Sequence, residues 1–253
     1  MDYLKQKLLK CEPVYGTHVQ MRDITVSDIF SNYDYDFIWV DTEHSAIDYA
    51  TLLNHITVIE GKGKKAIVRC SMDDFNHTKR VLEMGPSGVI FPMINTREEA
   101  EKAIRSTYYP PKGNRGCGPQ RANGYGKISL EENRAREENF IRIIQLETRA
   151  AIENLEEIIK VDGIDCFVFG AVDLSADLND YNNVFGEITQ NYIKKAISVL
   201  KKNNKSIGIS TASCNIETLK FWRDLGINFI STGSDFNYLD FMARQTIATV
   251  KKL

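Results

Sequence analysis

Two acidic residues, Glu147 and Asp173, each stand shortly after a short apolar run, and no cationic neighbour in the sequence neutralises both. If both runs are strands that end at one cavity, the two carboxylates repel each other unless a proton or a cation joins them. Two carboxylates, with the remaining positions left to water and substrate, are a usual environment for Mg²⁺ or Mn²⁺. The sequence therefore indicates a divalent cation site. The spacing is equally compatible with Glu147 pairing with Arg149 or capping the helix that follows.

Further polar groups follow other apolar runs. The segment 41–44, Asp-Thr-Glu-His, follows one run, and Arg69 ends another. An arginine that finishes a buried strand needs an anionic partner, which is either a substrate carboxylate or developing oxyanion, or a salt bridge to Asp41 or Glu43. His44 could be a general base because its unperturbed pKa is about 6.5, although a structural role is commoner for a lone histidine.

The other three histidines carry weaker signals. His55 and His77 lie in helical patterns away from this group, and we expect structural roles for both. His18 ends the first apolar run, which leaves its role open.

These residues must be positioned by eight short apolar runs, rich in β-branched and aromatic residues, that alternate with amphipathic stretches. Eight parallel strands alternating with helices in about 250 residues are typical of a TIM barrel, whose chemistry is built at the carboxyl ends of the strands. We therefore predict an α/β fold, a (β/α)8 TIM barrel, as a single domain over residues 1–253. Helical spacing predicts covering helices over 46–59, 193–200 and 216–225. The expected strands are 14–18, 37–40, 66–69, 88–92, 141–146, 166–169, 206–209 and 229–231.

One segment, 108–126 (YYPPKGNRGCGPQRANGYG), breaks this rhythm. It is rich in Gly, Pro and Arg and is too long for an ordinary connection in a barrel. Its aromatic residues and arginines favour a structured lid or a subunit contact, and a mobile surface loop is the alternative.

The composition limits the partners. With 32 Lys and Arg against 34 Asp and Glu, the formal net charge is −2, so no bulk positive field attracts nucleic acid or an anionic membrane. The five cysteines are scattered and never form a C-x-x-C pair, which fits a reducing cytoplasm better than a disulfide framework or a zinc site. No apolar run approaches the roughly 18 residues of a membrane span. A small molecule is the expected ligand.

Several motifs together resemble the HpcH/HpaI aldolase family, which comprises metal-dependent pyruvate aldolases in the same superfamily as the citrate lyase β-subunit. The likeness runs in order from about residue 15 to residue 235, and the combination is far more specific than any one motif. The matching stretches are FIWVDTEH (37–44), IVR (67–69), VLEMGPSGVIFPMI (81–94), YYPPKGNRGCG (108–118), IIQLE (143–147) and FVFGAVDLS (167–175).

The resemblance implies a role for each residue of the group. Glu147 and Asp173 would bind the metal, Arg69 would face the keto oxygen of the substrate, and His44 would be the acid/base group. The substrate carboxylate would lie against the backbone of Gly170, Ala171 and Asp173, and Gln145 would line the same pocket.

The chain departs from the family pattern at two of its motifs. Glu83 stands where the family usually has Asp in L-D-x-G, and Gly170-Ala171-Val172-Asp173 stands for G-P-x-D. The first departure puts the partner of His44 in doubt. Glu83 is the first candidate to orient His44, and Asp41 is the next.

The activity implied is that of a class II aldolase, which cleaves a 4-hydroxy-2-oxoacid to pyruvate and an aldehyde through a metal-bound pyruvate enolate. Mg, Mn or Co would serve as the cation. The family also implies a homo-oligomer, a trimer or hexamer. The lysines cluster in helices rather than at strand ends, which disfavours a Schiff-base route. The alternatives are a lyase acting on a CoA thioester, a sugar-acid-binding barrel without turnover, or a phosphosugar isomerase that would use 233–235.

Overall fold

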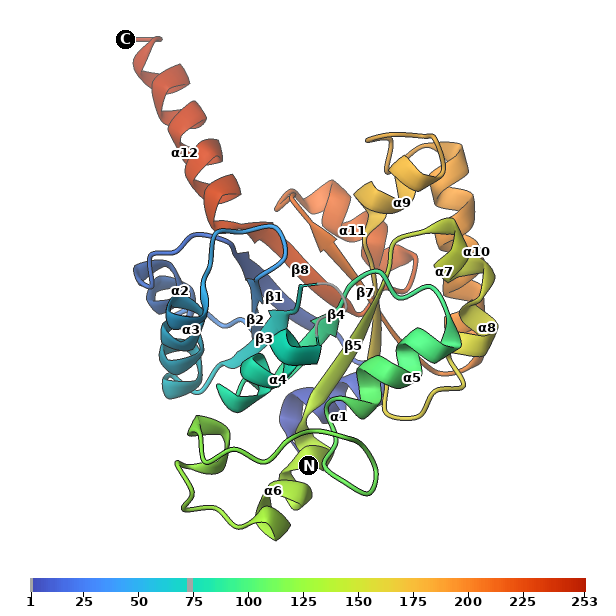
Figure 1. Ribbon diagram of the computed structural model, residues 1–253. Helices are drawn as coiled ribbons and strands as arrows, with labels where there is room; N and C mark the ends of the chain where they lie inside the picture. The colour runs from blue at the N-terminus through green and yellow to red at the C-terminus, as the bar shows by residue number, and fades with distance from the viewer. Residues whose placement is uncertain (1, 72–74) are drawn as a thin grey trace.

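The computed structural model describes residues 2–71 and 75–253. Its strands form one closed sheet in which each strand pairs in parallel with the next and β8 returns to β1 (Figure 1). Helices alternate with these strands around the outside. The predicted TIM barrel is therefore confirmed. The strands are β1 (Val14–Val19), β2 (Phe37–Asp41), β3 (Lys65–Arg69), β4 (Gly88–Phe91), β5 (Ile141–Leu146), β6 (Cys166–Phe169), β7 (Ser206–Thr211) and β8 (Phe229–Ser234).

All eight strands lie where the sequence predicts them. The predicted bounds of β5 and β6 agree with the structure, and the other strands differ by one to three residues at one end. The runs are apolar on both faces because one face meets the barrel interior and the other meets the helices. Phe37 and Trp39 of β2 belong to the interior cluster, whereas Ile38 and Val40 belong to the layer beneath the helices.

The helix α1 (Tyr3–Leu9) precedes the barrel and contributes to its interior. Leu4 and Leu8 are buried in the same cluster as Phe37 and Phe229, whose rings stack with centroids 4.1 Å apart. The helix lies at the end of the barrel where the strands begin (Figure 1). It therefore helps to fill the amino-terminal end of the barrel, which leaves the carboxyl end for the site.

The remaining helices, apart from α12, lie around the sheet. The predicted helix 46–59 begins instead at Tyr49, because the side chain of Asp48 accepts the N–H of Thr51 at 2.8 Å and caps the first turn. The helices are α2 (Thr25–Phe30), α3 (Tyr49–Gly61), α4 (Phe75–Glu83), α5 (Arg97–Arg105), α6 (Leu130–Arg136), α7 (Arg149–Glu153), α8 (Leu155–Ile158), α9 (Ala171–Asp177), α10 (Glu187–Lys202), α11 (Ile216–Asp224) and α12 (Asp235–Val250), with short 3₁₀ turns η1 (Arg121–Asn123) and η2 (Glu137–Asn139).

The Gly-, Pro- and Arg-rich segment 108–126 lies between α5 and α6, beside the amino-terminal end of the barrel (Figure 1). It is ordered against the end of α4, because Arg115 donates to the carbonyl of Leu82 at 3.1 Å and Arg121 donates to the carbonyl of Met84 at 2.8 Å. A lid over the carboxyl strand ends is therefore excluded within one chain. A subunit contact stays a prediction for this segment.

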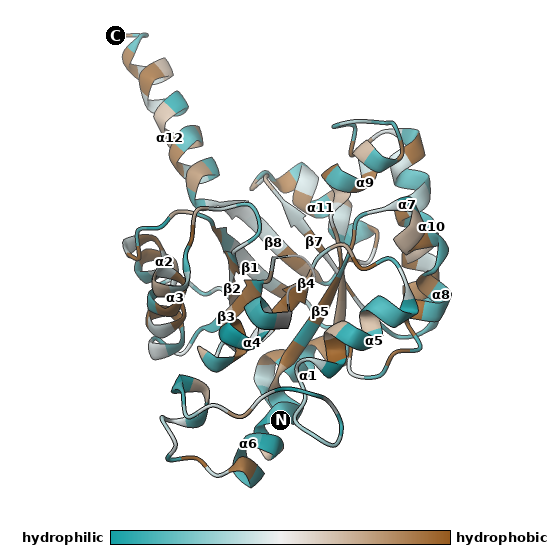
Figure 2. Ribbon diagram, viewed as in Figure 1, coloured by the Kyte–Doolittle hydropathy of each residue, from teal (hydrophilic) through white to brown (hydrophobic). Residues whose placement is uncertain are grey.

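The last helix, α12, projects away from the barrel rather than packing along it (Figures 1 and 2). Apolar side chains along α12 are between 46% and 60% exposed, and they are Phe236, Leu239, Phe241, Met242, Ile247 and Val250. A helix of this kind leaves an apolar surface without a partner among the described residues. Among the described residues, no helix is both long enough and apolar enough to cross a bilayer.

Candidate functional site

The carboxyl ends of β2 and β3 hold a buried ion pair. Asp41 and Arg69 are register partners at the ends of these strands. Arg69 donates from Nε to Asp41 Oδ1 at 2.9 Å and from Nη2 to Oδ2 at 2.6 Å. Burial alone would raise the pKa of Asp41, but the close approach of His18 and the hydrogen bonds from Arg69 hold that pKa well below its usual range. Asp41 is therefore ionised, and its two-pronged contact fixes the plane of the guanidinium.

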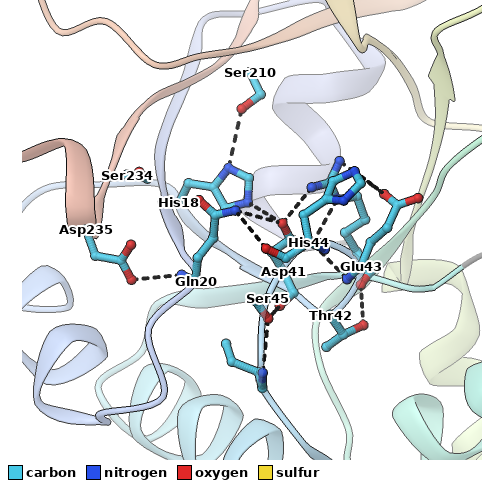
Figure 3. Close-up of polar contacts among 12 residues, drawn as sticks. His18, Gln20, Asp41, Thr42, Glu43, His44, Ser45, Ser210, Ser234 and Asp235 are labelled. Atoms are coloured by element: carbon cyan, nitrogen blue, oxygen red, sulfur yellow. Dashed lines mark hydrogen bonds and ion pairs between the residues drawn. The ribbon is translucent and has the colours of Figure 1, made fainter. Parts of the chain in front are cut away.

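The chain turns after Asp41 so that Glu43 and His44 follow at the rim of the barrel (Figure 3). Asp41 Oδ1 accepts the backbone N–H of Glu43 at 3.0 Å and of His44 at 3.4 Å. The Glu43 carboxylate lies 3.2 Å from Arg69 Nη1 and 3.7 Å from His44 Nε2. The imidazole of His44 is 58% exposed. Asp41 thus positions the backbone of His44, and Glu43 is the carboxylate beside its ring.

His18 joins this group from the end of β1. Its Nε2 lies 3.5 Å from Asp41 Oδ2, its Nδ1 lies 3.4 Å from Ser210 Oγ, and its ring packs on Trp39 with centroids 4.9 Å apart (Figure 3). Burial lowers the pKa of His18 although the nearby carboxylate of Asp41 opposes this. His18 is therefore neutral near pH 7 and packs behind the ion pair.

Glu147 directly follows β5 and is only 3% exposed. Its Oε1 accepts the backbone N–H of Met93 at 2.5 Å, and its Oε2 accepts a hydrogen bond from Gln145 Nε2. Met93 has a φ of 54°, in the left-handed region that residues with side chains rarely adopt. A Cβ on Gly170 would lie 2.5 Å from Glu147 Oε2, so the close approach of these elements requires glycine there.

The structural alternatives for Glu147 are wrong. The following helix, α7, is capped by Thr148, whose Oγ1 accepts the N–H of Ala151 at 3.0 Å. The guanidinium of Arg149 lies over the ring of Tyr192, with its carbon 6.0 Å from the ring centroid. Glu147 therefore turns into the barrel mouth and neither caps the helix nor pairs with Arg149.

Three carboxylates act on one another at the strand ends. Burial, together with the charges of Glu43 and Asp173, raises the pKa of Glu147 to about 7, although the hydrogen bonds from Met93 and Gln145 oppose this. Burial also raises the pKa of Glu43, and the charges of Asp41 and Asp173 add to this. Asp173 is exposed, in the first turn of α9, after Gly170 and Ala171. Carboxylates that repel one another suit a divalent cation, because its positive charge would reduce the repulsion and carboxylate oxygens are its preferred ligands.

Glu83 lies elsewhere. It is the last residue of α4, which runs back from the end of β3 toward the start of β4, so it lies at the amino-terminal end of the barrel. Burial raises the pKa of Glu83, while the charge of Arg115 and the backbone of Gly118 lower it. The prediction that Glu83 orients His44 is therefore wrong within one chain. Within one chain the two residues lie at opposite ends of the barrel.

The family model described as HpcH/HpaI aldolase/citrate lyase matches residues 15–240, nearly the whole barrel. The chain belongs to this family. The resemblance seen in the sequence motifs is thereby confirmed, and the site just described is that of an HpcH/HpaI aldolase/citrate lyase family member.

Two aldolases with curated names are similar to this HpcH/HpaI family chain over almost their full length. A hydroxypyruvate/pyruvate aldolase of Roseovarius nubinhibens is 29% identical over 246 residues, covering 96% of this chain and 95% of that protein. A 4-hydroxy-2-oxo-heptane-1,7-dioate aldolase of Escherichia coli is 30% identical over 237 residues, covering 93% and 89%. A solved HpcH/HpaI family structure from Burkholderia cenocepacia has a TM-score of 0.94 at 24% identity, over 99% of this chain and 100% of that one.

Two residues at the HpcH/HpaI site could not be identified from the sequence, Gln20 and Met93. Gln20 donates from Nε2 to Asp41 Oδ2 at 3.2 Å, and its backbone N–H donates to Asp235 at 2.8 Å (Figure 3). Met93 contributes only its backbone to Glu147. The one signal available for Gln20 in the sequence was its position, two residues after the expected strand 14–18.

Proposed function

We propose that the chain is a class II pyruvate aldolase, a carbon–carbon lyase that cleaves a 4-hydroxy-2-oxoacid to pyruvate and an aldehyde. The observation that carries the proposal is the grouping of Glu43, Glu147 and Asp173 beside a fixed guanidinium at the strand ends. The aldolase names of relatives along nearly the whole chain support it, and they favour it over a CoA-thioester lyase or a barrel without turnover.

Glu147 and Asp173 are the proposed ligands of a divalent cation, Mg²⁺, Mn²⁺ or Co²⁺. Their chemistry fits, since both offer carboxylate oxygens and the buried one is destabilised as an anion. Among the described residues, no three His, Cys, Asp or Glu side chains are arranged together as metal ligands. The proposed site therefore has two protein ligands, which would leave the other coordination positions for substrate and water. When bound, the cation would stabilise negative charge on the substrate oxygens.

Side chains and backbone groups of the protein would stabilise the enolate, transfer the proton and bind the substrate carboxylate. Arg69, oriented by Asp41, would donate to the 2-oxo oxygen as enolate charge develops there. His44, exposed at the rim, would take the proton of the 4-hydroxyl group. The backbone at Gly170, Ala171 and Asp173 would hold the substrate carboxylate, while Gln145 would fix Glu147 in place.

The strand ends also lack the group that the other class of aldolase needs. The last residues of the eight strands, all within the described part of the chain, include no lysine. An amine that forms an imine with a 2-oxoacid would have to stand there. This composition supports enolate stabilisation by charge rather than by Schiff-base chemistry.

The function is tested by the exchange of the methyl protons of pyruvate for deuterium from the solvent. Purified protein with Mn²⁺ or Mg²⁺ in deuterated water is expected to erase the methyl proton signal of pyruvate, because an enolate must form in both directions of the reaction. Borohydride added with pyruvate is expected to leave no mass adduct on the protein. Persistence of the methyl signal with every cation, or a reduced adduct on a lysine, would contradict the proposal.

Cation affinity should depend on pH through Glu147. Its pKa is raised to about 7 in the cation-free protein, so below that pH the carboxyl holds a proton that a cation must displace. We expect affinity to be flat above about pH 8 and to fall by about ten-fold per pH unit below about pH 6. Calorimetric titration with Mn²⁺ from pH 5.5 to 8.5 measures this. Constant affinity across that range would remove Glu147 from the ligand set.

The exposed apolar surface of α12 supports assembly into a homo-oligomer, a trimer or hexamer. Apolar side chains recur along the projecting helix and remain exposed in the part of the chain that the structure describes. Packing them on another copy would remove that surface from water, which is the main driving force of association.

We expect the double substitution of Leu239→Asp and Met242→Asp to shift the protein to smaller species in analytical ultracentrifugation. These side chains are 60% and 55% exposed, so the changes place charge in a contact between copies without disturbing the barrel core. The control is Gln245→Asp on the same helix. An unchanged sedimentation coefficient for the double variant would assign α12 no role in assembly.

The state of the cysteines indicates the redox environment of the protein. All five lie within the described residues and are free thiols, with Cys11, Cys117 and Cys214 exposed. Exposed free thiols support a reducing environment such as the cytoplasm.

A further inference from the structure

A second cavity, of about 530 Å³, opens at the amino-terminal end of the barrel, opposite the site described above. Its walls come from the start of β3, the turn between α4 and β4, the segment 108–126 and the residues that lead into β5. A volume of this size lies within the range of roughly 300 to 1,000 Å³ that is usual for small-molecule sites. None of the proposed aldolase residues lines it.

Basic side chains outnumber acidic ones in this wall. Lys65, Arg115, Arg121 and Arg136 line the cavity together with two acidic residues, Asp2 and Glu137. Asp2 is already paired with Lys65, at 2.6 Å between Oδ2 and Nζ. The Glu137 carboxylate accepts the backbone N–H of Tyr109, and burial raises its pKa. The arginines therefore give the cavity an excess of positive charge.

Arg115 is the most constrained of these arginines. The residue is only 9% exposed, its guanidinium carbon lies 4.7 Å from the ring centroid of Tyr109, and Nη2 donates to the carbonyl of Leu82 at 3.1 Å. Nε is buried and has no hydrogen-bond partner among the described residues. The charge of Arg115 acts on Glu83 and Glu137, yet neither carboxylate forms an ion pair with it in the described part of the chain. A buried guanidinium in this state is costly unless an anion approaches it.

A second buried guanidinium lies just behind the wall. Arg142 is fully buried, donates from Nη1 to the carbonyls of Glu137 and Phe140 at 3.2 and 3.0 Å, and has no partner for Nη2 among the described residues. Glu137 and Phe140 both line the cavity. The peptide groups at this end of the wall are thus polarised by a buried positive charge, which adds to the field inside the cavity.

We propose that this cavity is a binding site for a small oxyanion with two negative charges, a phosphate or a dicarboxylate. Arg115 and Arg121 are held by packing and by carbonyl groups, so their guanidinium planes are oriented before a ligand arrives. Arg136 is exposed at the rim and can close on the ligand. Fixed guanidinium groups bind carboxylate and phosphate in two-pronged fashion, which suits this ligand class. The site is independent of the aldolase proposal.

The experiment is isothermal titration calorimetry of the full-length protein with inorganic phosphate, and separately with malonate, at pH 8 and low ionic strength. We expect saturable binding of at least one anion, and the tighter of the two identifies the source as a phosphate or a dicarboxylate. Arg136→Gln, at an exposed position that the fold tolerates, and Arg115→Gln are each expected to weaken binding by about ten-fold or more. Arg105→Gln removes the same charge from an exposed position outside the wall and is expected to leave binding unchanged.

Three results would overturn the site. The first is the absence of saturable binding of either anion. The second is equal weakening by Arg136→Gln and Arg105→Gln, which would show a general charge effect. The third is binding that survives Arg136→Gln but is lost in Arg69→Gln, which would place the anion at the carboxyl end of the barrel. Arg136→Gln alone decides the question if Arg115→Gln fails to fold.

Discussion

Glu147→Ala is expected to lower aldol cleavage by about a thousand-fold or more, and chelation of divalent cations should do the same to the unaltered protein. A cation at an enolate contributes several kcal/mol to the transition state, and each 1.36 kcal/mol corresponds to about ten-fold in rate. Without the Glu147 carboxylate, Asp173 is the single remaining proposed ligand, and it is exposed to water. The measurement is the steady-state rate of pyruvate release, with cation binding followed by calorimetry.

The matched control for this prediction is Glu157→Ala, which removes an exposed carboxylate from α8. Glu147→Gln keeps the shape of the side chain and guards against loss of folding, which thermal unfolding would reveal. As a further control, adding Mg²⁺, Mn²⁺ or Co²⁺ to the chelated, unaltered protein should restore its activity. A folded Glu147→Gln protein that binds cation and turns over normally would refute the assignment.

Arg69→Lys is expected to lower kcat by about a hundred-fold although the positive charge is kept. The guanidinium makes two hydrogen bonds to Asp41 and a third contact, at 3.2 Å, to Glu43, and a compact ammonium cannot reproduce this planar arrangement. Loss of one fixed donor to a developing oxyanion costs roughly a hundred-fold or more. The measurement is kcat and KM for cleavage, together with the rate of pyruvate proton exchange.

The control for the second prediction is Arg97→Lys, at an exposed arginine that pairs with Glu101 on the same helix. A loss confined to KM would mean that Arg69 binds substrate without stabilising the enolate. Full activity of Arg69→Lys with normal proton exchange would reduce Arg69 to a structural partner of Asp41.

The strands could be predicted closely because each is a local run of β-branched or aromatic residues, and burial on both faces leaves a strong pattern. The helix ends were less certain, as the start of α3 at Tyr49 shows, because a cap such as Asp48 competes with the apolar stripe. Residues at strand ends followed from the strands themselves, which is why Asp41 and Arg69 were identified.

Three-dimensional neighbours could not be predicted in the same way. His18 meets Asp41 through strand pairing, and Glu83 was linked to His44 by motif order although α4 carries it to the other end of the barrel. The length of 108–126 suggested a lid, yet a connection that leads from a helix into the next strand lies where the strands begin. In each case the side of the barrel, rather than the residue type, decided the outcome.

The pairing of β1 with β8 has a consequence for how the protein is made. The backbone N–H of Gln20 donates to Asp235, 215 residues further along the chain, and Gln20 in turn binds Asp41. A chain emerging from the ribosome can form the pairs between β1 and β7 one after another, but it cannot complete this side of the site until β8 and the first turn of α12 have been synthesised. Contacts of such sequence separation form slowly, so the rim of the catalytic mouth is the last part of the barrel to be completed.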